Sequence, residues 1–491
     1  QELASCYKAL HTCHRDDFLT LARGTLSGVM ERIDTPECAH RQISTPMSPT
    51  PSPDESDATP SDATQTGNYF VANYPPFSCW RREDAGLALA RLATPPVAQT
   101  PFGLYVHIPF CRKRCDFCYF RVYTDKDSRA VHRYIDAVIE EIRLHAASAA
   151  VAGRKPEFVY FGGGTPSYLS VDQLKKLFDG IQEHLPWETA REGTFECEPG
   201  TLHEKTIHAL KDLGVTRLSL GVENFDPEIL ERNNRAHRAK EIEKSYRIAL
   251  EAGFQQVNID LIAGMIGETD ANWRSCIERT VEMAPDSVTI YQMEIPYNTT
   301  VAGRMKASGE DTAPVADWPT KRRWVDEAFT ALEQHGYRIG SAYTAARGDD
   351  AKFLYRDGLW HGADLLGVGV ASFSHVGGVH FQNLHDFDPY LECVESGQLP
   401  VHRAMQLDAD QRLIREFILQ LKLGSVDTRY FSDKFGIDPL VRFKTPLAKH
   451  QSDGYLSIEG PHVKVARHGL LQIDRLLHDF FPEEHRAVRY A

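Results

Sequence analysis

The 491-residue chain lacks long apolar runs and a disulfide framework. No apolar segment reaches the roughly 18 residues that a membrane-spanning helix needs, so we expect no membrane span. The ten cysteines are scattered apart from one local group, a usage that suits a reducing compartment. We therefore expect a cytoplasmic protein.

The chain also lacks an excess of basic charge. Its formal net charge is -13 and its isoelectric point is near 5.9. A broad basic surface for nucleic acid or an anionic membrane is therefore not expected, and we predict no nucleic-acid partner. The glycine run at 162–164 is not followed by GK[ST], which excludes a P-loop.

Composition divides the chain into four predicted parts. Residues 44–66 are almost entirely Ser, Thr, Pro, Asp and Ala, a composition that cannot bury enough apolar surface to offset the entropy of ordering. We predict an N-terminal extension over 1–66 that includes this disordered linker, a strap over 67–102, an α/β barrel over 103–300 and a C-terminal domain over 301–491.

Strand-like and helical segments alternate between Gly103 and Pro296. Six segments have the near-continuous apolar character of parallel strands covered on both faces: 103–110, 157–163, 194–199, 217–223, 256–264 and 287–295. Capping boxes at 170–173 and 201–204 predict the starts of two intervening helices. Because the polar and glycine signals follow the strands, we predict a partial (β/α)6 barrel with its site at the carboxyl ends of the strands.

The segment beyond residue 310 has a different pattern. It predicts a helix-rich region with a glycine-rich strand at 364–374, helices at 408–423 and 438–450, and two short strands within 453–465. This is a smaller, helix-rich domain with a winged-helix-like end. Since the chain is acidic, we interpret the wing as a structural or lid element rather than a DNA reader.

Three cysteines, Cys111, Cys115 and Cys118, follow the first predicted strand. Iron–sulfur clusters are normally held by four thiolates, so three local ligands leave one iron open to something that is not protein. The alternative is a structural zinc site, which requires a fourth Cys or His at usable spacing.

Polar residues recur where the later strands end. The run FGGGTPS (161–167) predicts close approach of a ligand to the backbone, with N–H groups arranged for a carboxylate. Further candidates are Glu196, Glu198, Glu223, Arg235 and Asp260. For Asp260, within an apolar run, the alternative is a buried salt bridge with Arg217 or Arg235.

The cysteine motif CxxxCxxC, the GGGTP run and six β-α units together resemble the radical S-adenosylmethionine enzymes. More narrowly, YVHIPFC, GVTRLSLGVENFD, NNRAH, NIDLIAG and LLGVGVASFS are similar to the oxygen-independent coproporphyrinogen III oxidase family, which also contains haem chaperones and S-adenosylmethionine-dependent methyltransferases. The resemblance implies a [4Fe-4S] cluster on the three cysteines, one or two molecules of S-adenosylmethionine, and formation of a 5'-deoxyadenosyl radical.

The resemblance also assigns cofactor contacts. Those to a first S-adenosylmethionine would be Tyr105, Gly163 and Glu196. Those to a second would be Phe117, Gly164, Thr165, Glu223, Arg235 and Asp260, with Phe373 as a further adenosine contact. Tyr105 and Glu223 are our candidates for catalytic side chains.

Two departures from the family pattern concern the substrate. Phe120 stands where the oxidase has a further cysteine, and Glu223 stands where it has glutamine. In contrast, residues 68–77 resemble the tyrosine–proline segment that closes over the oxidase site.

The hypotheses are oxidative decarboxylation of coproporphyrinogen III, methyl transfer with two S-adenosylmethionines, and haem chaperoning with an exposed histidine such as His107 as ligand. Either enzymatic reading needs an electron donor such as flavodoxin or ferredoxin.

Overall fold

The structure is a computed structural model that describes residues 62–97, 100–348 and 351–486. Residues 1–61 of the predicted N-terminal extension, with most of its linker, lie outside the described residues. The prediction of disorder is wrong for the end of the linker, because Thr64 is buried and its hydroxyl donates to Ala316 O at 2.9 Å. Among the residues that are described, no helix combines the length and the apolarity needed to cross a bilayer.

A twelve-stranded sheet organises the fold, with the strand order β12-β11-β10-β9-β1-β2-β3-β4-β5-β6-β8-β7. Its centre consists of six parallel strands in chain order. They are β1 (Phe102–Ile108), β2 (Phe158–Gly163), β3 (Glu192–Cys197), β4 (Arg217–Glu223), β5 (Gln256–Ala263) and β6 (Ser287–Gln292). These strands confirm the predicted partial barrel.

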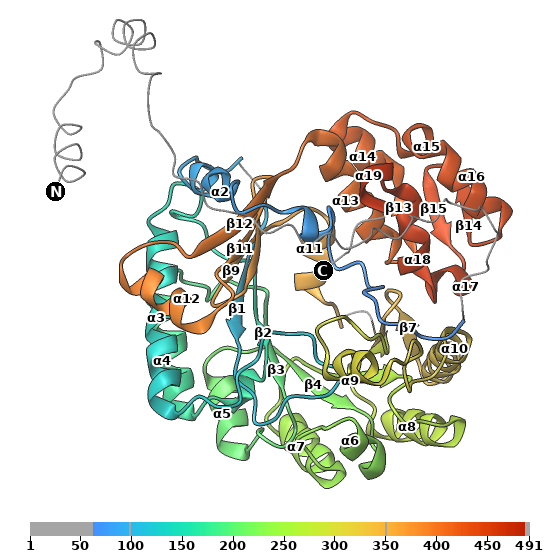
Figure 1. The fold of residues 1–491 in the computed structure, drawn as a ribbon, viewed down its shortest axis with the longest axis horizontal. Helices are drawn as coiled ribbons and strands as arrows, with labels where there is room; N and C mark the ends of the chain where they lie inside the picture. The colour runs from blue at the N-terminus through green and yellow to red at the C-terminus, as the bar shows by residue number, and fades with distance from the viewer. Residues whose placement is uncertain (1–61, 98–99, 349–350, 487–491) are drawn as a thin grey trace, which may run out of the picture. The chain divides into compact units, whose positions relative to one another are not determined.

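Helices connect the parallel strands and cover their outer face. Figure 1 shows α3, α4, α5, α7, α6, α8 and α10 following one another around the outside of the strands. Their bounds are α3 (Ser128–Ala146), α4 (Val171–His184), α5 (Glu204–Asp212), α6 (Pro227–Arg232), α7 (Ala239–Glu251), α8 (Asp270–Met283) and α10 (Trp318–Gln334), with the shorter α9 (Thr300–Ser308) after β6.

Alternation along the strands separates an apolar outer face from a polar interior. In β5, Val257, Ile259 and Leu261 are buried in the main hydrophobic core. The intervening Asn258 faces inward, where its side chain bonds Ser219 and Ser287 at 2.9 and 2.7 Å. The barrel interior is therefore a hydrogen-bonded polar space rather than a second apolar core.

The region after residue 310 extends the same sheet at both edges. At one edge lie β8 (Thr344–Arg347) and β7 (Tyr337–Ile339). At the other, β9 (Asp364–Val368) pairs in parallel with β1, followed by β10 (Phe373–Val376), β11 (Val379–Asn383) and β12 (Val401–Gln406). The sheet thus continues across the predicted boundary at residue 300, and the domain bounds stay a prediction.

The single strand predicted over 364–374 is wrong, because the chain turns between β9 and β10. Gly369 and Ala371 both have positive φ, 100° and 60°, which no strand accommodates. The Gly369 N–H instead donates to the buried Glu141 carboxylate at 2.8 Å. The turn therefore has a dedicated partner on α3.

The C-terminal part is helix-rich, as predicted, and includes a small antiparallel sheet in the order β13-β15-β14. Its elements are α11 (Leu354–Trp360), α12 (Phe387–Glu395), α13 (Ala409–Leu421), β13 (Ser425–Asp427), α14 (Thr428–Phe435), α15 (Pro439–Arg442), α16 (Lys444–Ser452), β14 (Leu456–Glu459), β15 (His462–Val465), α17 (Arg467–Leu470), α18 (Ile473–Leu477) and α19 (Glu483–Arg486).

Of the two predicted capping boxes, the one at Ser170 and Gln173 is confirmed at the start of α4. The one at Thr201 is wrong, since His203 is the N-cap of α5 and makes no side-chain cap bond. The Thr201 hydroxyl is bonded to Glu198 O and Ser167 Oγ, at 3.0 and 2.6 Å. The Thr201 hydroxyl is therefore already bonded within the turn that precedes α5, and it does not cap that helix.

The predicted strap is anchored by buried charged groups. Glu294, just past β6, accepts the N–H groups of Tyr69 and Phe70, at 2.6 and 3.1 Å. The fully buried Lys422 donates to Val71 O at 2.6 Å and pairs with Asp474 at 2.7 Å. The strap continues through the short α2 (Ala85–Leu92), which packs beside β12.

Candidate functional site

The three cysteines lie on a closed loop between β1 and α3. Tyr123 closes its neck, since its N–H donates to Pro109 O and its carbonyl accepts from Cys111 N, at 2.8 and 3.1 Å. The Thr165 N–H donates to Phe110 O at 2.8 Å, and the Thr165 hydroxyl lies 3.3 Å from Cys111 Sγ. The predicted residue Thr165 thus meets the cysteine loop directly.

Two other segments hold the far side of the loop. Asp116 N–H donates to Asn233 O at 3.2 Å, and Asn234 Nδ2 donates to Arg114 O at 2.8 Å. The Asp116 carboxylate, 4% exposed, pairs with Arg304 of α9 at 2.5 Å. The NNRAH segment and α9 therefore fix the cysteine loop from two directions.

The three thiols are partly buried and close enough to affect one another electrostatically. Burial, together with the neighbouring cysteines, raises the pKa of Cys111 to about 12 and that of Cys118 to about 11. Across the described ranges, no three His, Cys, Asp or Glu side chains are grouped tightly enough to bind one metal ion. A closed four-ligand zinc site is therefore not preformed among the described residues.

The glycine run after β2 is required by packing. A Cβ on Gly163, where φ is 110°, would lie 2.4 Å from the His107 ring, and one on Gly164 would lie 2.9 Å from Ile108 O. The predicted free N–H groups are wrong: Gly163 N–H donates to Glu196 at 3.2 Å and Gly164 N–H to Ile108 O at 2.8 Å. The close backbone approach seen here is between strands of the protein itself, and the approach of a ligand to these glycines stays a prediction.

Tyr105 on β1 and Glu196 on β3 face the barrel interior from either side of β2. Glu196 accepts from the Tyr160 hydroxyl at 2.5 Å, and burial raises its pKa to about 7. Tyr105 stacks beside Tyr160, with centroids 6.0 Å apart, and its hydroxyl lies 3.0 Å from His107 Nδ1. His107 is only 5% exposed, so the expectation of an exposed haem-ligating histidine at this position is wrong.

Glu223 and Arg235 form a pair at the end of β4. Glu223 has the positive φ of 63°, which is uncommon for a residue with a side chain, and the β4–β5 register shifts beside it. Its carboxylate lies 3.4 Å from Arg235 Nη2, and burial raises its pKa to about 7. A Cβ on Gly221 would be 3.1 Å from Glu223 Oε1, so the glycine leaves room for the pair.

Asp260 lies in the polar interior but not in the predicted salt bridge. Its carboxylate accepts from Ser219 Oγ and Asn258 Nδ2, both at 2.8 Å. Burial raises its pKa, and it in turn raises the pKa values of Glu196 and Glu223. The structure therefore brings the three predicted carboxylates to one interior space.

The two predicted phenylalanines lie apart from each other. Phe117 of the cysteine loop packs against a small apolar cluster that includes Ile262 and Met293. Phe373, on β10, packs against Phe77 and Trp80 of the strap, with ring centroids 4.5 and 5.6 Å away. Phe373 thus touches the strap, two strands from β1 in the sheet.

Comparison with known proteins accounts for this arrangement. The family model for the radical SAM superfamily matches residues 105–280. The heme chaperone HemW of Mycobacterium tuberculosis is 30% identical over 331 residues, covering 67% of this chain and 83% of the relative. The chain belongs to the radical SAM superfamily, in the family of HemW and its oxidase relatives.

Other members of the family match over a greater length. The oxygen-independent coproporphyrinogen III oxidase of Escherichia coli is 29% identical over 415 residues, covering 80% of this chain and 88% of the relative. The solved structure of coproporphyrinogen III oxidase (HemN) from E. coli superposes with a TM-score of 0.73 at 25% identity, covering 85% of this chain and 99% of that one.

Membership in the superfamily implies a [4Fe-4S] cluster and S-adenosylmethionine. The donor set of this radical SAM protein fits such a cluster, because it offers three thiols on one loop and leaves a fourth position for a ligand that is not protein. Glu196, Glu223 and Asp260 bring three carboxyl groups to the barrel interior, and their contacts to S-adenosylmethionine stay a prediction.

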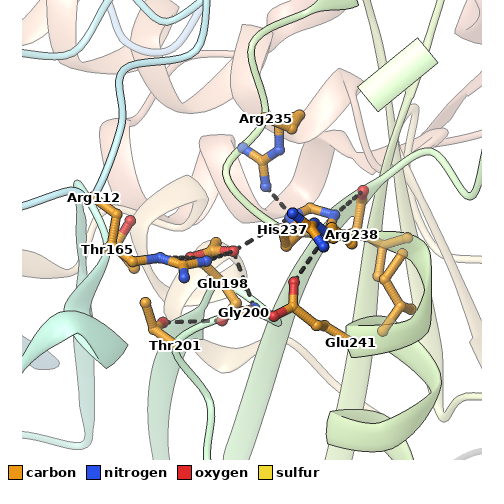
Figure 2. Close-up of polar contacts among 12 residues, drawn as sticks. Arg112, Thr165, Glu198, Gly200, Thr201, Arg235, His237, Arg238 and Glu241 are labelled. Carbon is orange, nitrogen blue, oxygen red and sulfur yellow. Dashed lines mark hydrogen bonds and ion pairs between the residues drawn. The ribbon is translucent and has the colours of Figure 1, made fainter. Parts of the chain in front are cut away.

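Sequence reasoning missed a network that holds this loop (Figure 2). Glu198, named from its place after β3 but given no role, accepts from Arg112 Nη2 and Gly200 N–H, at 2.9 and 3.0 Å. His237 Nδ1 lies 3.5 Å away, while its Nε2 faces Val222 O at 3.2 Å. Burial opposes ionisation of Glu198, but His237 and Arg112 outweigh it and keep its pKa below the usual value.

Two signals in the sequence point to this network. Arg112 directly follows a cluster cysteine, and His237 ends the NNRAH motif. Neither signal reveals that Glu198 is a partner of both residues, because Arg112 and His237 are far apart along the chain and meet only through Glu198.

Proposed function

We propose that this radical SAM protein binds its [4Fe-4S] cluster through Cys111, Cys115 and Cys118 and acts on a tetrapyrrole of haem biosynthesis. The cluster and S-adenosylmethionine would together supply a 5'-deoxyadenosyl radical that abstracts hydrogen from the substrate. The favoured reaction is oxidative decarboxylation of two propionates of coproporphyrinogen III to vinyl groups. The observation that carries the proposal is the meeting of the cysteine loop with the polar rim, through Thr165 at Cys111 and Arg235 at Cys115.

The chain's own residues would orient the cofactor and keep water from it. Glu196 accepts from Gly163 N–H and lies within electrostatic reach of Tyr105 on the β1–β3 side, where we place a first S-adenosylmethionine. Glu223, Arg235 and Asp260 lie on the β4–β5 side, where a second would bind, with Gly164, Thr165 and Phe117 at the loop. Because burial raises the pKa values of Glu196 and Glu223 to about 7, either carboxyl is poised to hold or release a proton near neutral pH.

The strap supports the oxidase reading over the chaperone reading. Residues 66–81 run from a bridge between Thr66 and Ile295, just past β6, to a bridge between Arg81 and Ala404, within β12. Phe77 also packs on Phe373, which couples the strap to a predicted adenosine contact. The oxidase structure aligns with 85% of this chain, whereas the HemW relative aligns with 67% of it.

Methyl transfer is the second candidate, and Glu223 favours it. A carboxylate in place of glutamine changes the charge of the proposed second pocket, and a cationic sulfonium gains more from a negative charge than from an amide. Chaperoning is the third, supported by the HemW relative.

The test uses anaerobically reconstituted, reduced protein with S-adenosylmethionine, with and without coproporphyrinogen III. Mass spectrometry follows 5'-deoxyadenosine and the porphyrin. Deoxyadenosine together with loss of two carboxyl groups establishes the oxidase. Deoxyadenosine without that loss contradicts it and directs the search to methyl transfer, and haem binding without deoxyadenosine supports the chaperone.

A further inference from the structure

The strand β4 ends in a strained turn centred on Glu223. The Asn224 N–H donates to Val222 O at 2.8 Å, across a Glu223 whose φ is 63°. A hydrogen bond of this kind around a residue with positive φ is typical of the rare, strained form of the γ-turn. Such a conformation persists only where the surrounding structure holds it. The turn therefore needs an anchor outside β4.

Asn224, the residue after the turn, is fully buried and is bonded at both ends of its side-chain amide. Its Nδ2 donates to Glu268 Oε1 at 2.6 Å, and its Oδ1 accepts the Asp226 N–H at 2.9 Å. Glu268 belongs to the loop between β5 and α8. A second bond runs from Asn272 Nδ2, in the first turn of α8, to Asp226 Oδ2 at 2.6 Å. The segments that follow β4 and β5 are therefore joined at two points next to Glu223.

The other oxygen of Glu268 holds the loop to which Glu268 belongs. Its Oε2 accepts the N–H groups of Gly264 and Met265, at 2.7 and 3.1 Å. Burial raises the pKa of Glu268 to about 8, although these N–H groups and Asn224 oppose the shift by favouring the charged form. One carboxylate thus connects the start of the β5–α8 loop to the residue that follows Glu223.

The same loop also holds the segment that carries Arg235. The fully buried Asn233 accepts the Ile266 N–H with its Oδ1 and donates to Ile266 O from its Nδ2, both at 3.1 Å. Arg235 Nη2 lies 3.4 Å from Glu223 Oε1, and its Nη1 lies 3.2 Å from Cys115 Sγ. The loop after β5 therefore fixes both members of the Glu223–Arg235 pair.

We propose that the Asn224–Glu268 pair positions Glu223 and Arg235 for the binding of S-adenosylmethionine. This inference rests on the proposed function, which assigns Glu223 and Arg235 to that ligand. Asn224 and Glu268 are positioning residues, because they act through Glu223 rather than by contact with the ligand. Loss of their bond should weaken the part of the binding that depends on Glu223 and leave the cysteine ligands in place.

Two changes of nearly constant size break the pair. With its oxygen bonded to the loop N–H groups, Glu268→Gln directs an amide N–H group at the donating Nδ2 of Asn224. Asn224→Asp removes that donor and brings two carboxylates together. The double variant Asn224→Asp/Glu268→Gln exchanges donor and acceptor, so the hydrogen bond should form again in the opposite direction. A role that depends on this bond predicts that the double variant recovers what each single variant loses.

The experiment measures binding of S-adenosylmethionine to each reconstituted holoprotein by anaerobic equilibrium dialysis. Glu223→Ala defines the part of the binding that depends on this carboxylate, and Glu278→Gln, which changes an exposed residue of α8, is the matched control. Iron content and formation of 5'-deoxyadenosine by dithionite-reduced protein are measured in parallel. Hydrogen exchange over residues 222–226 and 264–268 of the metal-free proteins reports the loops without any cofactor.

We expect each single variant to weaken the Glu223-dependent binding about tenfold and to accelerate hydrogen exchange in both segments, with wild-type iron content. The double variant should restore both properties. Glu268→Gln should add little to the loss in Glu223→Ala, because residues that act through one another are not additive.

Wild-type binding in both single variants would overturn the inference, as would a loss of binding that the double variant does not restore. Wild-type binding by Glu223→Ala, or an equal loss in Glu278→Gln, would overturn it as well. A wild type that forms no 5'-deoxyadenosine would instead refute the proposed function.

Discussion

Arg235 connects the loop of the three cysteines to the end of β4. Its Nη1 lies 3.2 Å from Cys115 Sγ and its Nη2 donates to Gly221 O at 2.7 Å, beside Glu223. Burial alone would lower the pKa of Arg235, but Cys115 and Glu223 outweigh burial and raise it. A fixed positive charge therefore lies beside the proposed cluster ligand.

Arg235→Gln should weaken cluster retention. Loss of a charged hydrogen bond to a ligand sulfur leaves Cys115 less well oriented, and losses of this kind typically reduce metal affinity about 10- to 100-fold. The measurement is the rate of iron release to a chelator from the reconstituted protein. Arg232→Gln, which breaks only a surface pair with Glu228, is the control and should behave as wild type.

Cys115→Ala should abolish the iron–sulfur absorption and the cleavage of S-adenosylmethionine while the fold persists. Cys115 is not part of a hydrophobic core, so its loss should change the thermal midpoint little. Iron content, absorbance and circular dichroism check this. Cys393→Ala, on α12, should keep the cluster; retained cleavage by Cys115→Ala would refute the assigned ligand role.

The barrel strands were predictable because each is a local apolar run with a turn signal at its end. Predicted bounds such as 217–223 and 256–264 match β4 and β5 to within a residue. Pairing of β9 with β1 was not predictable, since it joins Leu366 to Leu104 across most of the chain and no local pattern records it.

Site residues that a sequence motif marks could be predicted, whereas contacts that depend on how distant segments pack could not. Arg235 and Thr165 come from motifs, and the structure brings both to the cysteines. The occupied N–H groups of Gly163 and Gly164 depend on strands meeting in space, as does the convergence of Arg112 and His237 on Glu198. Sequence spacing carries no information about such meetings.

Glu198→Ala should loosen the cysteine loop. The change leaves Arg112 without its carboxylate and removes the acceptor of Gly200 N–H, and charge-assisted bonds of this kind contribute about 1.5 to 3 kcal/mol. Hydrogen exchange in the metal-free protein should accelerate over residues 111–118. Glu188→Ala, exposed after α4, should leave exchange unchanged; equal protection of the loop in both variants would show that Glu198 does not position it.

Glu294→Gln should change how stability depends on pH. Burial raises the pKa of Glu294 to about 7, above its unfolded value of about 4.3. The folded state therefore binds more protons, and the free energy of unfolding falls as pH rises between those values. Glutamine keeps an oxygen for the N–H groups of Tyr69 and Phe70 but has no charge.

Urea unfolding at pH 5 and pH 8 provides the measurement. The difference in free energy of unfolding between Glu294→Gln and wild type should shift in favour of the variant by on the order of 2 kcal/mol from pH 5 to pH 8. The exposed Glu278→Gln on α8 should show no such gain. Parallel pH profiles for wild type and Glu294→Gln would contradict burial of this carboxyl under the strap.

The most direct test of the account is the electron paramagnetic resonance spectrum of the reduced, reconstituted protein before and after addition of S-adenosylmethionine. A [4Fe-4S] cluster held by Cys111, Cys115 and Cys118 has one iron without a protein ligand, so the account predicts a clear change of the signal on addition, together with release of 5'-deoxyadenosine. A cluster signal that S-adenosylmethionine leaves unchanged would contradict an open iron at this site.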